Sequence, residues 1–125
     1  MRFPHLTAAL LLGVGVVMAA TPVSALPVPA EFSAHVTVTT VLTQGGAKER
    51  FQVHCPSSSA VACRALRLHP EVLWPEVGRQ CSQQYAGPEW ARIRGVVNGR
   101  KVDLTIARNN GCGIADWRAL KGLLP

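Results

Sequence analysis

The chain has 125 residues, of which 13 are Lys or Arg and 7 are Asp or Glu, so its formal charge at neutral pH is +6. This length suits one ordinary small domain. The basic residues are scattered and form no block of about five or six like charges, which favours a solvated basic surface over a nucleic-acid interface. We therefore expect no nucleic-acid partner. Weak binding to a negatively charged surface is the alternative that the net charge leaves.

Residues 1–25 have the pattern of a secretory signal peptide. Arg2 precedes an apolar run without charged residues from Leu6 to Ala20, which is shorter than the about 20 residues that a transmembrane helix needs. The small residues around Ser24 predict cleavage after Ala25, and a membrane anchor is the disfavoured alternative. We expect an exported, extracellular chain with 12 basic and 7 acidic side chains, a formal charge of +5, and no membrane contact after cleavage.

All four cysteines, Cys55, Cys63, Cys81 and Cys112, lie in the expected mature chain. An even count in a short exported chain predicts two disulfides. The gaps between the cysteines are far wider than the C-x₂-C spacing of zinc sites, so no metal is expected. Four cysteines allow three pairings, and their spacing alone does not choose among them.

The first half of the mature chain predicts an arm, a hairpin and a helix. Residues 26–34 contain two prolines and are expected to form an extended N-terminal arm. Alternation of apolar and polar residues predicts strands over 35–42 and 50–55, paired as an antiparallel hairpin with one solvent-exposed face. Helix-forming residues over 60–68, with Ser59 as a cap, predict a short helix. The residues expected to face inward on this helix are Ala62, Ala65 and Leu66.

The middle of the chain is expected to be irregular. Pro70 and Pro75 prevent a long continuation of the helix. Residues 78–88 are mostly polar and show neither a helical nor a strand period. They predict an exposed loop that is held at one point, Cys81.

A second hairpin is the clearest local signal. Strands are predicted over 90–97 and 100–107, and Asn98-Gly99 between them favours a type I′ turn. Residues 109–111 are expected to end the last strand. Together these features predict an α+β domain over 35–125, with a small antiparallel sheet of about five strands, one or two short helices and two disulfides. Apolar residues of the C-terminal tail are expected to pack on the sheet: Trp117, Leu120, Leu123 and Leu124.

The sequence contains no familiar catalytic motif. There is no G-x-S-x-G, H-E-x-x-H or glycine-rich phosphate loop. His35 and His54 lie on the polar side of predicted strands, and His69 precedes a proline, so their surroundings do not mark them as catalytic. We expect a protein that is not an enzyme, with no catalytic residue and no cofactor.

Several short motifs follow one another in a specific order in the second half. They are Cys81-Ser82-Gln83-Gln84-Tyr85, then Pro88, then a strand pair around a glycine turn over 97–102, then Asn110-Gly111-Cys112. This C-x-x-x-Y loop, glycine turn and N-x-C ending resemble the subtilisin inhibitor-like (SSI) family of secreted bacterial serine protease inhibitors. Residues 49–56 and Ala62-Cys63 resemble the first half of that family, so the resemblance covers most of 34–117.

The resemblance implies a disulfide pairing and a reactive loop. Carried over to this chain, the disulfide pairs of the family are Cys55–Cys63 and Cys81–Cys112. The reactive bond of the family corresponds to the peptide bond between Gln83 and Gln84. Family members often have proline, then methionine or lysine, where this chain has Ser82 and Gln83, and the stretch from Cys55 to Cys63 is short for the family. Such a loop pairs with the protease as an added β-strand. The reactive-loop residues are Gln80, Cys81, Ser82, Gln83, Gln84 and Tyr85.

The expected function is inhibition of an extracellular serine protease of the subtilisin type, with Gln83 in the primary specificity pocket of the enzyme. The family also implies a two-fold homodimer through the exposed face of the sheet. The alternative function is a non-inhibitory secreted binding module on the same scaffold. A weaker third one is inhibition of a protease of another mechanism through a different loop.

Overall fold

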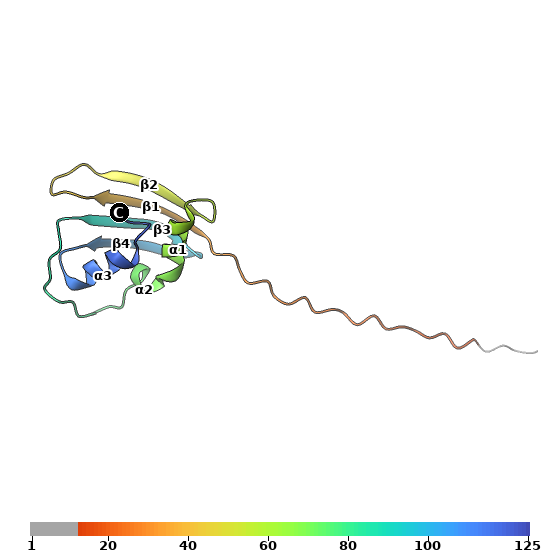
Figure 1. Ribbon diagram of the computed structural model, residues 1–125. Helices are drawn as coiled ribbons and strands as arrows, with labels where there is room; N and C mark the ends of the chain where they lie inside the picture. The colour runs from red at the N-terminus through yellow and green to blue at the C-terminus, as the bar shows by residue number, and fades with distance from the viewer. Residues whose placement is uncertain (1–12) are drawn as a thin grey trace, which may run out of the picture.

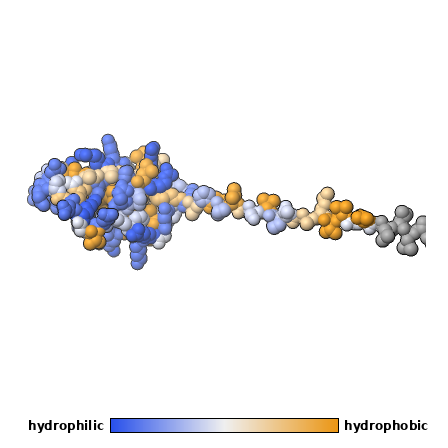
Figure 2. Space-filling model, turned by 90° about the horizontal axis from the view of Figure 1, so that it is seen from below, coloured by the Kyte–Doolittle hydropathy of each residue, from blue (hydrophilic) through white to orange (hydrophobic). Residues whose placement is uncertain are grey.

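The structure, a computed structural model, describes residues 13–125, so the first part of the expected signal peptide lies outside the described residues. Residues 13–31 are exposed, contain neither helix nor strand, and run away from the folded domain (Figure 1). Figure 2 shows apolar residues gathered in this segment, whereas the face of the domain in that view is mostly hydrophilic. Within residues 13–125, no helix is long and apolar enough to cross a membrane.

Four antiparallel strands form one sheet. In chain order they are β1 (Ala34–Val41), β2 (Glu49–Cys55), β3 (Trp90–Val97) and β4 (Arg100–Ala107), and they lie side by side as β2-β1-β3-β4. The α+β class and both predicted hairpins are confirmed, and each strand begins and ends within one residue of its prediction. The sheet has four strands rather than about five, because the residues outside the two hairpins form helices and loops.

Two backbone features shape the hairpin of β3 and β4. Asn98 and Gly99 have φ angles of 47° and 78°, and a type I′ turn requires positive φ at both central residues. Gly95 in β3 has φ of 151°, and a Cβ atom there would lie 2.0 Å from the carbonyl oxygen of His35. Only glycine therefore allows β3 to lie this close to β1 at that position.

Three helices cover one face of the sheet: α1 (Ala60–Leu68), α2 (Pro70–Leu73) and α3 (Gly111–Ala119) (Figure 1). The expected bounds of α1 and its three inward residues are confirmed. Its cap is not, since the side chain of Ser59 makes no capping hydrogen bond. As expected, the helix has no long continuation, since α1 ends at Leu68 and α2 has four residues. Pro70 begins this short separate turn, because the missing N–H of proline costs nothing at the first helical position.

Helix α3 was not among the predicted elements. The side chain of Asn110 caps it by accepting a hydrogen bond from the backbone N–H of Gly113 at 2.9 Å. Gly113 packs so closely on β4 that a Cβ atom would lie 1.7 Å from the carbonyl oxygen of Ala107. Gly111 and Gly113 in the first turn lower the helix propensity, so the local sequence does not predict this helix. The segment read as a strand end, 109–111, is therefore also a helix start, and Asn110 was the available signal.

The core lies between the sheet and the helices. Val38, Ile93, Leu66 and Leu120 are almost completely buried there, and the apolar tail residues Trp117, Leu120, Leu123 and Leu124 are buried as expected. The Cys55–Cys63 disulfide joins the end of β2 to α1. The end of the expected arm is also held, because Phe32 packs against the core.

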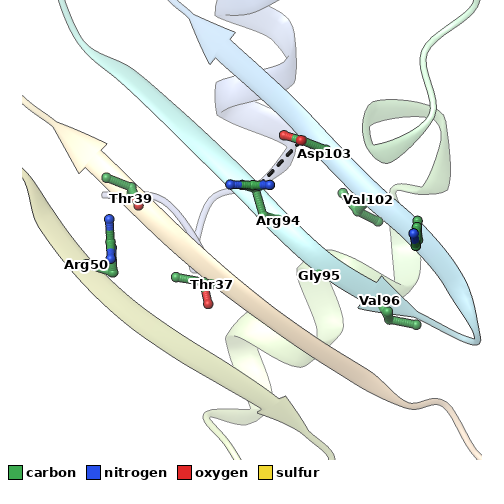
Figure 3. Close-up of a pocket in the computed structure, with 9 residues that line it drawn as sticks. Thr37, Thr39, Arg50, Arg94, Gly95, Val96, Val102 and Asp103 are labelled. Atoms are coloured by element: carbon green, nitrogen blue, oxygen red, sulfur yellow. Dashed lines mark ion pairs between the residues drawn. The ribbon is translucent and has the colours of Figure 1, made fainter.

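The other face of the sheet, which we call the outer face, is not covered by helices (Figures 1 and 3). Arg94 and Thr37 line a shallow groove of about 620 Å³ on it (Figure 3). Asp103 accepts hydrogen bonds from Arg92 at 3.0 and 3.2 Å, and this contact lowers the pKa of Asp103. The outer face is basic, since one carboxylate lies among four cationic side chains: Arg50, Arg92, Arg94 and Lys101.

Candidate functional site

Residues 79–89 form an irregular segment between α2 and β3, as the sequence predicts (Figure 1). The six residues of the expected reactive loop, 80–85, lie at its centre. The segment is held at both ends by the parts of the chain that end β4 and begin α3. Together these attachments decide which residues of the loop stay free.

A disulfide and a backbone hydrogen bond attach the loop to the first turn of α3. Cys81 is bonded to Cys112, with 5.1 Å between the Cα atoms, and these are the partners that the resemblance implies. One residue further on, the carbonyl oxygen of Ser82 accepts a hydrogen bond from the N–H of Gly111 at 2.9 Å. A Cβ atom at Gly111 would lie 2.0 Å from the Oγ atom of Ser82, so glycine leaves room for this contact.

An ion pair fixes the chain just before the disulfide. Arg79 donates two hydrogen bonds to the carboxylate of Asp116 in α3, of which the Nη1–Oδ1 bond measures 2.9 Å. Asp116 is 7% exposed, and its hydrogen bonds raise the pKa of Arg79. Paired, charge-assisted hydrogen bonds of this kind fix orientation as well as distance. The residue just before the loop is therefore also attached to α3, in addition to the disulfide and the Ser82 hydrogen bond.

The far end of the loop follows the end of β4. The N–H of Ala86 donates to the carbonyl oxygen of Arg108 at 2.9 Å, and the N–H of Arg108 donates to the carbonyl oxygen of Glu89 at 3.2 Å. The side chain of Arg108 also donates to Glu89 Oε1 at 3.1 Å. A Cβ atom at Gly87 would lie 1.9 Å from the carboxylate of Glu89, so glycine again allows the close approach.

The residues between these two attachments are free. Gln83, Gln84 and Tyr85 are exposed, Tyr85 to 70%, and the attached residue Ser82 is exposed as well. Among residues 13–125, Gln83 and Gln84 have no hydrogen-bond partner in either backbone or side chain. The arrangement presents an accessible peptide bond, Gln83–Gln84, on a backbone whose two ends are fixed.

The three histidines within residues 13–125 lie away from this loop. His35 and His54 lie next to each other on the outer face. His69 bonds to Glu71 at 2.9 Å and thereby lowers the pKa of that carboxyl group. Among the residues that the structure describes, the loop therefore contacts the supporting residues and no histidine.

The supporting residues that were not among the predicted site residues include Arg79, Glu89, Arg108, Gly111 and Asp116. Gly111 belongs to the N-x-C motif and could have been noticed there. Arg79 and Asp116 are 37 residues apart, and no periodicity relates two side chains across such a distance.

Comparisons with protein-family models, with curated proteins and with solved structures find no match for this chain. Function is therefore inferred from the geometry of the loop and from the order of the sequence motifs.

Proposed function

We propose that this chain is a secreted inhibitor of subtilisin-type serine proteases and that its reactive bond joins Gln83 to Gln84. The observation that supports this most is the exposed segment 83–85 between fixed ends at Ser82 and Ala86. The motif order that resembles the SSI family supports the class of protease. The expected signal peptide and the two disulfides fit an oxidising extracellular environment.

The rigidity of the loop explains how an inhibitor differs from a substrate. A serine protease binds an extended segment as an added strand, and a flexible segment loses conformational entropy when it is bound. A loop held by Cys112, Gly111 and Arg108 has already lost most of that freedom, so binding is tighter.

The contacts that hold the loop also keep its two new chain ends in place after cleavage. If the protease cuts the Gln83–Gln84 bond, the new carboxyl end stays attached through Cys81–Cys112 and the new amino end stays attached through Ala86 and β3. The two ends remain close, so religation competes with release. The protease then stays occupied by the inhibitor.

The direct test is titration of active subtilisin with the mature chain, residues 26–125. We expect stoichiometric inhibition, since protease–inhibitor complexes are among the tightest protein complexes. Gln83→Asp should weaken inhibition by about a hundredfold or more, because it places an unpaired charge in an apolar pocket. Gln52→Asp introduces the same charge on the outer face and is the matched control. A parent chain that inhibits no more than its Gln83→Asp variant would contradict the proposal.

The alternative, a non-inhibitory secreted binding module, is favoured by the uncovered basic outer face with Arg50, Arg92, Arg94 and Lys101. The same assay separates the two functions. A folded chain with both disulfides that leaves subtilisin fully active would support the binding module.

We further propose that two copies associate as a two-fold dimer through the outer face. This association brings like charges together, and salt screens such charges over about 8–10 Å at physiological ionic strength. We therefore expect the dimer to be stronger at about 0.5 M salt than at about 0.05 M salt. Sedimentation equilibrium at the two salt concentrations measures this. A monomer at both, at micromolar concentration, would rule out the dimer.

A further inference from the structure

Two histidine rings meet on the outer face at its edge. His35 in β1 and His54 in the edge strand β2 are direct partners in the antiparallel register. Their Nδ1 atoms are 3.1 Å apart, and the rings meet edge to face with 4.5 Å between the ring centroids. Nineteen residues separate the two histidines in the sequence, so only the strand register brings them together.

The turn after β2 explains why these rings are so close. The N–H of His54 donates to Ser58 Oγ at 2.8 Å, and its carbonyl oxygen accepts from the N–H of Ser58 at 2.6 Å. The backbone polar groups of His54 therefore point away from β1. His35 and His54 form a non-hydrogen-bonded pair, the kind of cross-strand pair in which side chains approach most closely.

A neighbouring amide sets the proton on His54. Gln52 Oε1 lies 3.2 Å from His54 Nε2. An amide oxygen only accepts hydrogen bonds, so this contact favours the tautomer of the neutral ring that carries its proton on Nε2 and a lone pair on Nδ1. A carbonyl acceptor behind a ligating histidine fixes the ring and increases the basicity of the other nitrogen. In that tautomer the Nδ1 lone pair of His54 accepts a hydrogen bond from Nδ1–H of His35 at 3.1 Å, so a bound metal takes the place of this proton.

We propose that His35 and His54 form a binding site for a divalent transition metal ion of the Cu²⁺ and Zn²⁺ class. Metal–nitrogen bonds of about 2.0–2.1 Å to two atoms 3.1 Å apart correspond to an angle of about 95–102° at the metal. This angle lies close to the square arrangement that Cu²⁺ prefers. His35 binds through Nδ1 when its proton moves to the exposed Nε2 atom. Imidazole ligands and the Irving–Williams order predict that Cu²⁺ binds more tightly than Zn²⁺.

The surroundings leave the remaining positions on the metal to water. No cluster of three or more His, Cys, Asp or Glu that could hold a metal is present within residues 13–125, so two imidazoles are the protein ligands. Val96 is the neighbour of His35 on its other side, and Lys101 lies one strand further away. With strands about 4.8 Å apart, the backbone of Lys101 is about 10 Å from that of His35.

The test uses the mature chain without a histidine tag and titrates it with CuCl₂ and, separately, ZnCl₂ by calorimetry. We expect one Cu²⁺ per chain, with nitrogen splittings from two imidazoles in the electron paramagnetic resonance spectrum. His35→Asn and His54→Asn should each weaken Cu²⁺ binding by about tenfold or more. His69→Asn removes a histidine that bonds to Glu71 elsewhere and should leave Cu²⁺ affinity unchanged.

A second measurement follows from the position of the site. A metal held by both histidines joins the edge strand β2 to β1, so it should raise the melting temperature of the parent chain and not that of the His35→Asn/His54→Asn double variant. Thermal melts without metal show that the variants fold. Equal Cu²⁺ affinity and equal stabilisation in the parent and the double variant would overturn the proposal. Subtilisin inhibition does not enter this test, so the two proposals can fail separately.

Discussion

The Gln83→Lys variant is expected to inhibit trypsin at least about a hundredfold more tightly than the parent chain does. The primary specificity pocket of trypsin ends in a buried carboxylate. When Gln83 occupies that pocket, the carboxylate has no cationic partner, and an unpaired buried charge costs several kcal/mol. The lysine side chain supplies the missing charge. Because each 1.4 kcal/mol is a factor of about ten in affinity, the gain is large enough to be unmistakable.

Inhibition constants against trypsin and subtilisin check this expectation for the parent and two further variants. Gln52→Lys adds the same charge on the outer face and should leave trypsin inhibition weak. Gln83→Met should tighten binding to subtilisin several-fold, because an apolar side chain loses less hydration in a mostly apolar pocket. If Gln83→Lys and Gln52→Lys act alike on trypsin, the reactive bond does not join Gln83 to Gln84.

The elements that could be predicted from the sequence are those whose conformation is determined by residues close to one another along the chain. Alternation over about eight residues predicts each strand, and Asn98-Gly99 predicts the turn that the structure contains. Helix α1 follows from its own helix-forming residues and inward-facing apolar side chains. Helix α3 follows instead from tertiary packing, because Gly113 is required by the contact with Ala107 and lowers the helix propensity that a local pattern would need.

The same distinction holds for the candidate site. The absence of periodicity over 78–88 predicts a loop, and the resemblance to a family supplies the Cys81–Cys112 pair that the structure contains. The contacts that hold the loop could not be predicted, because Arg79 and Asp116 meet only after α3 has packed beside the loop. The pairing of His35 with His54 likewise depends on the register of β1 and β2.

Removal of the Cys81–Cys112 disulfide should turn the inhibitor into a substrate. In the Cys81→Ser/Cys112→Ser variant, the approach to the loop is held only by the Arg79–Asp116 ion pair and the bond from Gly111 to Ser82. The loop then regains conformational freedom, and after cleavage only these non-covalent contacts hold the new carboxyl end, so it leaves more readily. We expect inhibition to weaken by about a hundredfold or more and to be lost over time as subtilisin cuts after Gln83.

The other disulfide provides a matched control, because it joins β2 to α1 and includes no residue of the loop. Cys55–Cys63 spans 8 residues and Cys81–Cys112 spans 31, so chain entropy predicts losses in the free energy of unfolding of about 2–3 and about 3–4 kcal/mol, respectively. Urea unfolding measures both losses, and mass spectrometry during incubation with subtilisin detects cleavage. Below the unfolding transition, Cys55→Ala/Cys63→Ala should remain an uncut inhibitor, whereas Cys81→Ser/Cys112→Ser should be cut. If both variants stay folded and inhibit like the parent, rigidity at Cys81 is not the source of inhibition. If both are cut at the same rate, global stability protects the loop, and the local disulfide does not.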